Sequence, residues 1–144
     1  MELIQIQDDW NIGHCSDDPV RGHLPLAYRI SNGREVYALE NEDSVIQAVI
    51  CVAYANKVPT NEQELTEFST VDGDIAIFYT VWSYAKGAGR DMVLRAADHI
   101  KNTKNVKRYV TLSPKTEMAM KFHLRNGAEW VSENTESNNF EYTV

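Results

Sequence analysis

A strand that runs into a helix through a glycine turn is the feature that most constrains the fold. The segment IAIFYTVWSY, residues 75–84, is rich in β-branched and aromatic residues, which favour a strand. Gly87 and Gly89 follow it, and from Arg90 the apolar residues recur with the period of a helix. The inward face of this helix is expected to carry Val93, Ala96, Ala97 and Ile100. The pattern indicates a sheet with a helix packed on it.

A hairpin is predicted before this segment. In LPLAYRISNGREVYALE, two runs of strand-forming residues flank Asn32 and Gly33, a dipeptide that tolerates the positive backbone angles of a tight turn. Residues 45–55, VIQAVICVAYA, are apolar enough for a strand buried on both faces. We therefore expect three successive antiparallel strands between Leu26 and Ala55.

The rest of the chain completes an α+β pattern. Turn signals and periodicity predict a weak strand at 1–7, a loop or short irregular helix at 8–23, a helix at 62–68 begun by Thr60 or Asn61, a strand at 106–112, a helix at 116–126, and strands at 128–133 and 139–144. The helix at 116–126 should bury Met118, Ala119, Phe122 and Leu124 and end at Gly127. We expect a single domain over residues 1–144, with a mixed, mostly antiparallel sheet flanked by helices.

Composition narrows the classes of function. The chain is 43% hydrophobic and 24% charged, as in ordinary globular proteins, and no apolar run approaches the ~20 residues that span a bilayer. The net charge of −7 argues against a nucleic-acid partner, which needs clustered Lys and Arg. Because MELIQIQDDWNIGH lacks the features of a signal peptide, we expect a cytoplasmic protein with no membrane partner.

Cysteine and histidine usage indicates neither a disulfide framework nor a metal site. Cys15 and Cys51 are too few for a framework and are expected to be reduced thiols. His14, Cys15 and His23, with Asp17 and Asp18 nearby, match no common zinc spacing, so we expect no metal.

The glycine turn is suited to an anion. Without side chains at Gly87 and Gly89, backbone N–H groups at the start of the helix can point outward, and Lys86 and Arg90 flank them with positive charge. A P-loop would need Lys-Ser or Lys-Thr after the last glycine, and a dinucleotide fingerprint would need Gly or Ala where Met92 stands. The alternative is a tight turn whose glycines only satisfy backbone geometry.

Two segments resemble motifs of the GCN5-related N-acetyltransferase (GNAT) family. YAKGAG is similar to the signature (Gln or Arg)-x-x-Gly-x-(Gly or Ala), and TEMAMKFHLRNGA is similar to the helix pattern Asn-x-x-Ala-x-x-φ-Tyr-x-x-x-Gly-Phe. Residues that match the helix pattern in register are Ala119, Phe122 and Gly127. Residues that depart from the two patterns are Tyr84, Thr116, His123 and Ala128.

The resemblance implies an acyl-coenzyme A site. The backbone N–H groups of Gly87, Ala88, Gly89 and Arg90 would hold the pyrophosphate of acetyl-CoA, beside Lys86. The strand before the turn would splay from its neighbour, usually with a β-bulge. Val81 and Trp82 at its end would offer backbone groups to the pantetheine arm and the acyl carbonyl.

The resemblance also implies catalytic roles. His123 replaces the tyrosine that commonly protonates the departing thiolate. Since imidazole titrates near ~6.5 against ~10 for a phenol, His123 is a proton donor only if its site favours the charged form; otherwise it is a base or a partly exposed helix residue. Carboxylates considered as the general base are Glu40, Glu42, Asp43 and Asp74. Asp74 ranks first, and a water chain is the alternative.

The function that follows is acyl transfer from acetyl-CoA to a small-molecule or peptide amine. A catalytically inactive GNAT-fold binding or structural protein is the alternative, motivated by Tyr84, Thr116 and His123, and an unrelated α+β domain is a third. The short N-terminal region is similar to that of small phage-encoded members. Tyr79, Trp82, Tyr84 and Trp130 either line a substrate groove or belong to the core. A homodimer would form if the final strand, FEYTV, were an exposed edge.

Overall fold

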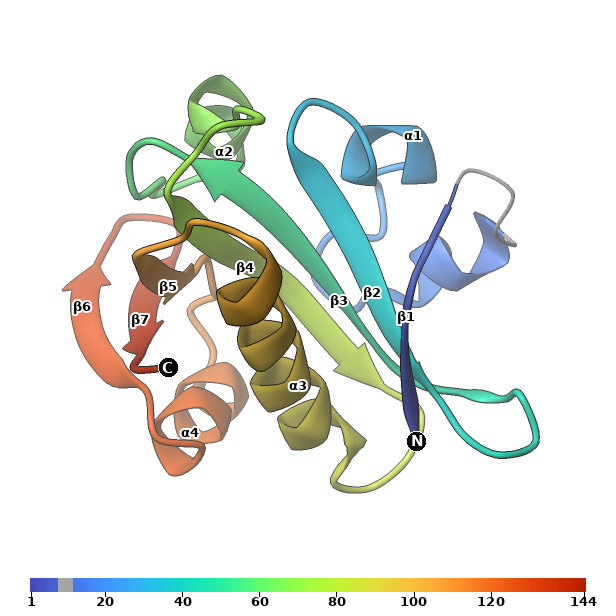
Figure 1. Cartoon of the computed structure of the whole chain (residues 1–144). Coiled ribbons are helices and arrows are strands. Elements are labelled where there is room, and N and C mark those ends of the chain that lie inside the picture. Colours follow the sequence, from blue (N-terminus) through green and yellow to red (C-terminus); the bar gives the residue numbers. More distant parts are fainter. Residues whose placement is uncertain (8–11) are drawn as a thin grey trace.

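One mixed sheet organises residues 1–7 and 12–144, the part of the chain that this computed structural model describes (Figure 1). Its seven strands lie in the order β1-β2-β3-β4-β5-β7-β6, and every neighbouring pair is antiparallel except β4 and β5. The strands are β1 (Glu2–Gln5), β2 (Arg34–Glu40), β3 (Ile46–Ala55), β4 (Ile75–Ser83), β5 (Arg108–Thr111), β6 (Glu129–Glu133) and β7 (Asn138–Tyr142). The predicted α+β class with a mostly antiparallel sheet is confirmed.

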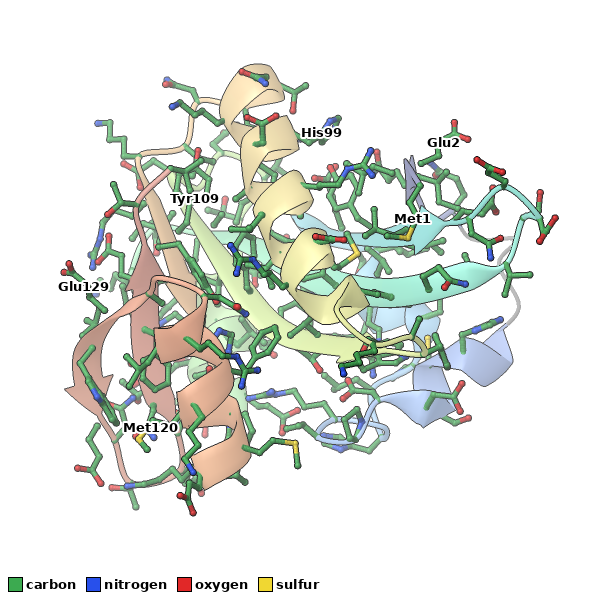
Figure 2. The ribbon with its side chains drawn as sticks, turned by 90° about the horizontal axis from the view of Figure 1, so that it is seen from below. Met1, Glu2, His99, Tyr109, Met120 and Glu129 are labelled. Atoms are coloured by element: carbon green, nitrogen blue, oxygen red, sulfur yellow. The ribbon has the colours of Figure 1, made fainter. Side chains whose placement is uncertain are left out.

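Helices cover both faces of the sheet. The helices are the 3-10 helix η1 (Ile12–Asp17), α1 (Leu26–Arg29), α2 (Glu62–Phe68), α3 (Ala88–Thr103) and α4 (Glu117–Arg125). Seen from below, α3 crosses one face, with Tyr109 on the sheet beside it and Met120 on α4 next to β6 and β7 (Figure 2). Side chains from η1, α1 and α2 bury the opposite face, including Cys15, Leu26 and Leu65. No helix within the described residues is long and apolar enough to cross a membrane.

The predicted hairpin is wrong on its first strand, because Leu26–Arg29 is the helix α1. Asn32 and Gly33 do take positive φ values of 52° and 80°, but they connect α1 to β2. In this run Leu26 and Arg29 are the buried residues, a spacing of three that suits a helix and not a strand. β2 pairs antiparallel with β3, as expected, and on its other side with β1, which confirms the weak strand predicted at the start of the chain.

The ends of the helices follow their capping residues. Of the two residues considered for α2, Asn61 is the cap, and its side chain accepts a hydrogen bond from the Glu64 N–H at 2.8 Å. Thr116 caps α4 in the same way through the Ala119 N–H at 3.2 Å. The short irregular helix expected within 8–23 is η1, although residues 8–11 of that stretch lie outside the described residues.

Two expectations for the C-terminal third need correction. Met118 is 82% exposed and Leu124 is also exposed, because the inward face of α4 carries Met120 and His123 instead. The final strand, β7, lies between β5 and β6, so a dimer cannot form by pairing along it.

Candidate functional site

The strands β4 and β5 separate partway along their length. They pair only from Ile75 to Phe78 on β4, and the last bond between them is the Leu112 N–H to the Phe78 carbonyl at 3.0 Å. After Thr111 the chain turns to β7, where Ser113 pairs with Asn138. We call this divergence, from Phe78 to Ser83 on β4, the fork; in Figure 1 it lies between the arrowhead half of β4 and the chain that leads from β5 to α4.

A β-bulge marks the point where the fork begins. Cys51 of β3 pairs with Thr80 and Val52 pairs with Phe78, so Tyr79 is the extra residue on β4. Beyond the bulge, the Tyr84 N–H donates to the Gln47 carbonyl at 2.8 Å. In an antiparallel ladder every second residue hydrogen-bonds to the partner strand. Because Tyr84 bonds to β3, the backbone N–H and carbonyl groups of Trp82 and Thr80 also face β3.

The same alternation leaves a short row of backbone groups facing the fork. The N–H and carbonyl of Val81 point away from β3. The carbonyl of Tyr79 also points away from β3, because it is trans to the N–H of Thr80 and no cis peptide occurs among the described residues. Val81 is therefore placed as expected for a group that binds a ligand through its backbone. Trp82 is not, since its backbone is committed to β3 and its side chain lies in the core on the η1 side.

The glycine turn follows the wide end of the fork. Gly87 has a φ of 80° and begins α3 without a side-chain cap. Ala88 N–H is used within the turn, by the Ala85 carbonyl at 3.2 Å. Gly89 and Arg90 N–H groups belong to the first turn of the helix and bond to none of the described residues. With the exposed side chains of Lys86 and Arg90 beside it, the turn offers an anion uncapped donors and positive charge.

The two sequence motifs meet in space at Gly89. A Cβ placed there would lie 3.3 Å from Cε1 of Phe122 on α4. Phe122 therefore packs directly on the start of α3, and a side chain at position 89 would require its ring to shift by a few tenths of an ångström. Val81, Ala85, Met120 and Phe122 are partly buried and pack against the core on this side of the sheet.

Solved structures share the fold of nearly the whole chain. The loading GNATL domain of CurA from Lyngbya majuscula has a TM-score of 0.72 at 14% identity, over 98% of this chain and 96% of its own. The spermidine N-acetyltransferase SpeG from Vibrio cholerae has 0.67 at 10%, over 98% and 92%. Tetrahymena GCN5 has 0.62 at 11%, over 98% and 94%.

The chain has the GNAT fold. No protein-family model and no curated protein sequence matches it. Malonyl-CoA decarboxylase from Agrobacterium vitis is also similar, with a TM-score of 0.66 at 16% identity over 78% of this chain. This chain covers only 33% of the length of that enzyme.

In this GNAT fold, His123 is a core residue. It is 5% exposed, its Nδ1 lies 2.7 Å from the Tyr142 hydroxyl, and its ring stacks on Phe140. Burial lowers the pKa of His123 to about 4. The imidazole is therefore neutral near pH 7 and cannot be the cationic proton donor, which corrects the first of the roles considered for it. It is not a partly exposed helix residue either.

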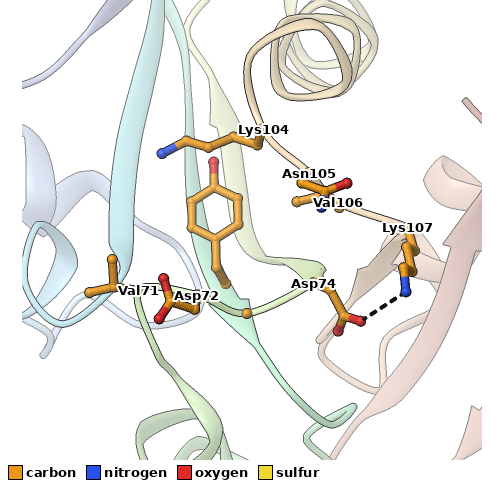
Figure 3. Close-up of a pocket in the computed structure, with 9 residues that line it drawn as sticks. Val71, Asp72, Asp74, Lys104, Asn105, Val106 and Lys107 are labelled. Atoms are coloured by element: carbon orange, nitrogen blue, oxygen red, sulfur yellow. Dashed lines mark ion pairs between the residues drawn. The ribbon is translucent and has the colours of Figure 1, made fainter.

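The ranking of Asp74 as general base does not agree with the geometry. Asp74 precedes β4, whereas the glycine turn follows it, and the two ends of this nine-residue strand lie about 26 Å apart. Asp74 instead pairs with Lys107 at 3.9 Å in a pocket of about 440 Å³ that Tyr54 and Lys104 also line (Figure 3). By contrast, the turn with Glu40, Glu42 and Asp43 lies at the same end of the sheet as Ser83, since Ala48 pairs with Ser83.

The structure adds a polar group that sequence reasoning missed. Tyr84, which stands where the family signature has Gln or Arg, donates from its hydroxyl to Asp17 of η1 at 2.7 Å and accepts from the Trp82 Nε1–H at 2.9 Å. Burial and this bond to Asp17 raise the pKa of Tyr84 to about 12. The substitution thus ties the N-terminal segment to the end of β4. Nothing in the spacing of Asp17 and Tyr84 along the sequence signals this contact.

Among the described residues, no three His, Cys, Asp or Glu side chains lie close enough to hold a metal ion.

Proposed function

We propose that the protein is an acyl-CoA-dependent N-acyltransferase that moves an acetyl group from acetyl-CoA to an amine. The observation that supports this most is one strand with two features along it: the free backbone groups of Val81 in the fork and the uncapped glycine turn after Ser83. A long ligand with a diphosphate at one end and a carbonyl at the other matches that layout. The GNAT fold is consistent with the same chemistry.

Different groups of this strand and turn would bind the two ends of acetyl-CoA. The N–H groups of Gly89 and Arg90, with the Lys86 and Arg90 side chains, take the pyrophosphate. Val81 N–H donates to the acyl carbonyl, whose oxygen gains negative charge as the amine attacks. This donor is fixed by the ladder with β3, so it needs no reorganisation during the reaction.

Proton transfer in this proposal does not use His123 as an acid. The amine loses a proton before it attacks, and the departing thiolate gains one, so the two transfers balance. The imidazole of His123 is neutral, with Nδ1 2.7 Å from the Tyr142 hydroxyl, and the N–H that a neutral imidazole retains is too weak an acid to protonate a thiolate. We assign both proton transfers to water. The carboxylates of Glu42 and Asp43, in the turn at this end of the sheet, are the groups that would accept the proton of the amine through that water.

A coenzyme A binding protein without turnover is the second candidate, and the burial of His123 favours it. Two of the other departures have structural explanations, since Thr116 caps α4 and Tyr84 binds Asp17. A small-molecule or peptide amine is the proposed acceptor for the active protein. Only a measurement of turnover with an amine acceptor distinguishes the enzyme from the binding protein.

The test is the melting temperature with and without acetyl-CoA, followed by an amine panel. Ligand at ~100 times its Kd adds about 2.7 kcal/mol, a rise of roughly 5–10 °C for a domain of this size. The double variant Lys86→Gln/Arg90→Gln should weaken binding by about tenfold or more, because two charges leave the anion site. Lys101→Gln, an exposed lysine near the other end of α3, is the matched control and should bind as wild type.

Three outcomes separate the candidates. Binding that Lys86→Gln/Arg90→Gln weakens, together with release of the coenzyme A thiol in the presence of spermidine, amino acids or a lysine peptide, supports the enzyme. The same binding with no thiol release on the panel supports the binding protein. A wild type that does not shift at saturating acetyl-CoA refutes both.

A further inference from the structure

A buried arginine lies at the start of the fork. Arg21, in the loop between η1 and α1, has a side chain that is only 7% exposed, and its Nη1 donates to the Tyr79 carbonyl. That carbonyl belongs to the bulge residue and points away from β3, toward the side where β5 has left the ladder. The guanidinium therefore occupies the vertex at which β4 and β5 part.

Other buried groups hold Arg21 in this position. Its backbone N–H donates to Asp18 Oδ1 at 3.0 Å, and its carbonyl accepts from Arg29 Nη2 at 2.7 Å. Asp18 Oδ1 also accepts from the Thr80 hydroxyl at 2.9 Å, which fastens the loop to the bulge itself. Glu62 lies 3.8 Å from Arg21 Nε and balances the charge. The loop is thus fixed to β4 on both sides of the peptide that joins Tyr79 to Thr80.

We propose that Arg21 is a positioning residue, which holds the Tyr79 carbonyl and leaves Val81 N–H as the donor to the acyl carbonyl of a bound thioester. This inference rests on the proposed function. A side chain of the N-terminal segment, outside both sequence motifs, thereby sets the electrostatics of the fork.

Arg21 acts by donating a hydrogen bond to the Tyr79 carbonyl, which would otherwise be a free acceptor at the vertex of the fork. Without Arg21, the Tyr79 carbonyl is a second oxygen at the vertex, close to the oxygen of the thioester, and the two repel each other. Arg21 occupies that acceptor and places a positive charge near the thioester oxygen, where negative charge grows during attack. The effect is larger for a ligand with an acyl carbonyl than for free coenzyme A, which has none.

That difference provides the test. Kd values for acetyl-CoA and for free coenzyme A are measured by calorimetry on wild type, Arg21→Met, Arg21→Lys and Arg34→Met. Arg34 is the matched control, because it is equally buried and also donates to a backbone carbonyl, that of Tyr28 at 2.7 Å, but its side chain donates no hydrogen bond to β4. The carbonyl stretch of acetyl-CoA labelled at the acetyl carbonyl carbon is recorded in the same complexes by difference infrared spectroscopy.

The expected results differ between the two arginines. Wild type and Arg34→Met bind acetyl-CoA about threefold to tenfold more tightly than coenzyme A, as one hydrogen bond allows, and both lower the carbonyl frequency. In Arg21→Met the ratio of the Kd for coenzyme A to the Kd for acetyl-CoA falls to about one, while the Kd for coenzyme A itself is unchanged. The carbonyl stretching frequency of bound acetyl-CoA returns toward that of free acetyl-CoA. Arg21→Lys, which retains a charge and a donor, restores part of both effects.

Other results overturn the inference. If wild type binds coenzyme A but Arg21→Met keeps the ratio and the frequency of Arg34→Met, the inference fails and the proposed function stands. If wild type binds neither ligand, the proposed function fails and the inference with it. Should Arg21→Met not fold, Arg21→Gln, whose amide is too short to reach the Tyr79 carbonyl, is measured against the same expectations.

Discussion

Removal of Arg29 should destabilise the protein far more than removal of any exposed charge. Arg29 and Asp18 are both 0% exposed and form an ion pair with Nη1 and Oδ2 at 2.9 Å. Arg29 also donates to the carbonyls of Leu24 at 2.9 Å and Arg21 at 2.7 Å, and to Cys51 Sγ at 3.3 Å. In Arg29→Met these acceptors lose their donor, and the Asp18 carboxylate stays buried without an opposite charge.

The expected loss follows from that uncompensated charge. Breaking a buried ion pair by removing one partner costs about 3–5 kcal/mol, which is a large part of a total stability of about 5–15 kcal/mol. Asp18 keeps three donors, the N–H groups of Val20 and Arg21 and the Thr80 hydroxyl, so the lower half of that range is expected. The double variant Asp18→Asn/Arg29→Met should lose less than the sum of the single losses, because neither charge is left alone.

Urea unfolding at pH 7 on the two single variants and the double variant measures this coupling. The exposed pair of Lys121 and Glu117, at 2.8 Å one helical turn apart, is the control, and Lys121→Met should cost under about 0.5 kcal/mol. A loss below about 1 kcal/mol for Arg29→Met, or single losses that simply add, would show that the buried charge is compensated by something other than the ion pair.

Three further changes test other parts of the structure. The pKa of His123 is lowered to about 4 in the fold; because the unfolded chain binds a proton near ~6.5, stability should fall by about 2–3 kcal/mol as pH drops from 7 to 4.5. His123→Gln should remove this part of the acid loss in urea titrations at the two pH values. Gly87→Ala should lower stability by about 1 kcal/mol, because its φ is 80° although its Cβ would meet nothing within 4 Å; an unchanged melting temperature would contradict the turn geometry. Asn139→Ala should cost about 3 kcal/mol, since Asn139 is fully buried and donates to the carbonyls of Pro59 and Thr111; thermal unfolding beside the more exposed Asn134→Ala checks it.

Where local patterns were strong, the sequence predicted the fold well. β4 and α3 were expected from period and composition alone, and the caps of α2 and α4 lie at residues whose side chains favour such positions. The run Leu26–Arg29 was predicted wrongly because its composition suits a strand. Its conformation depends on the buried partners that Arg29 finds in segments on either side of it along the chain, such as Asp18 and Cys51.

The candidate site was only partly predictable for the same reason. Gly87 and Gly89 predict the open turn before α3, since their effect is local to the backbone. Asp74 was ranked first on proximity along the chain to β4, yet a strand nine residues long carries its two ends far apart. His123 keeps its place in the helix pattern, but its neutral state comes from the packing of Phe140 and Tyr142 around it.

The sequence by itself determined most of the strands and helices and the position of the glycine turn, because these depend on residues close together along the chain. Tertiary structure alone decided which backbone groups face the fork and which charges are buried. The bulge at Tyr79 comes from a register with β3, and Arg21 reaches its carbonyl across 58 residues of sequence. Contacts of that range depend on how the whole sheet pairs, and no local pattern of residue types specifies that pairing.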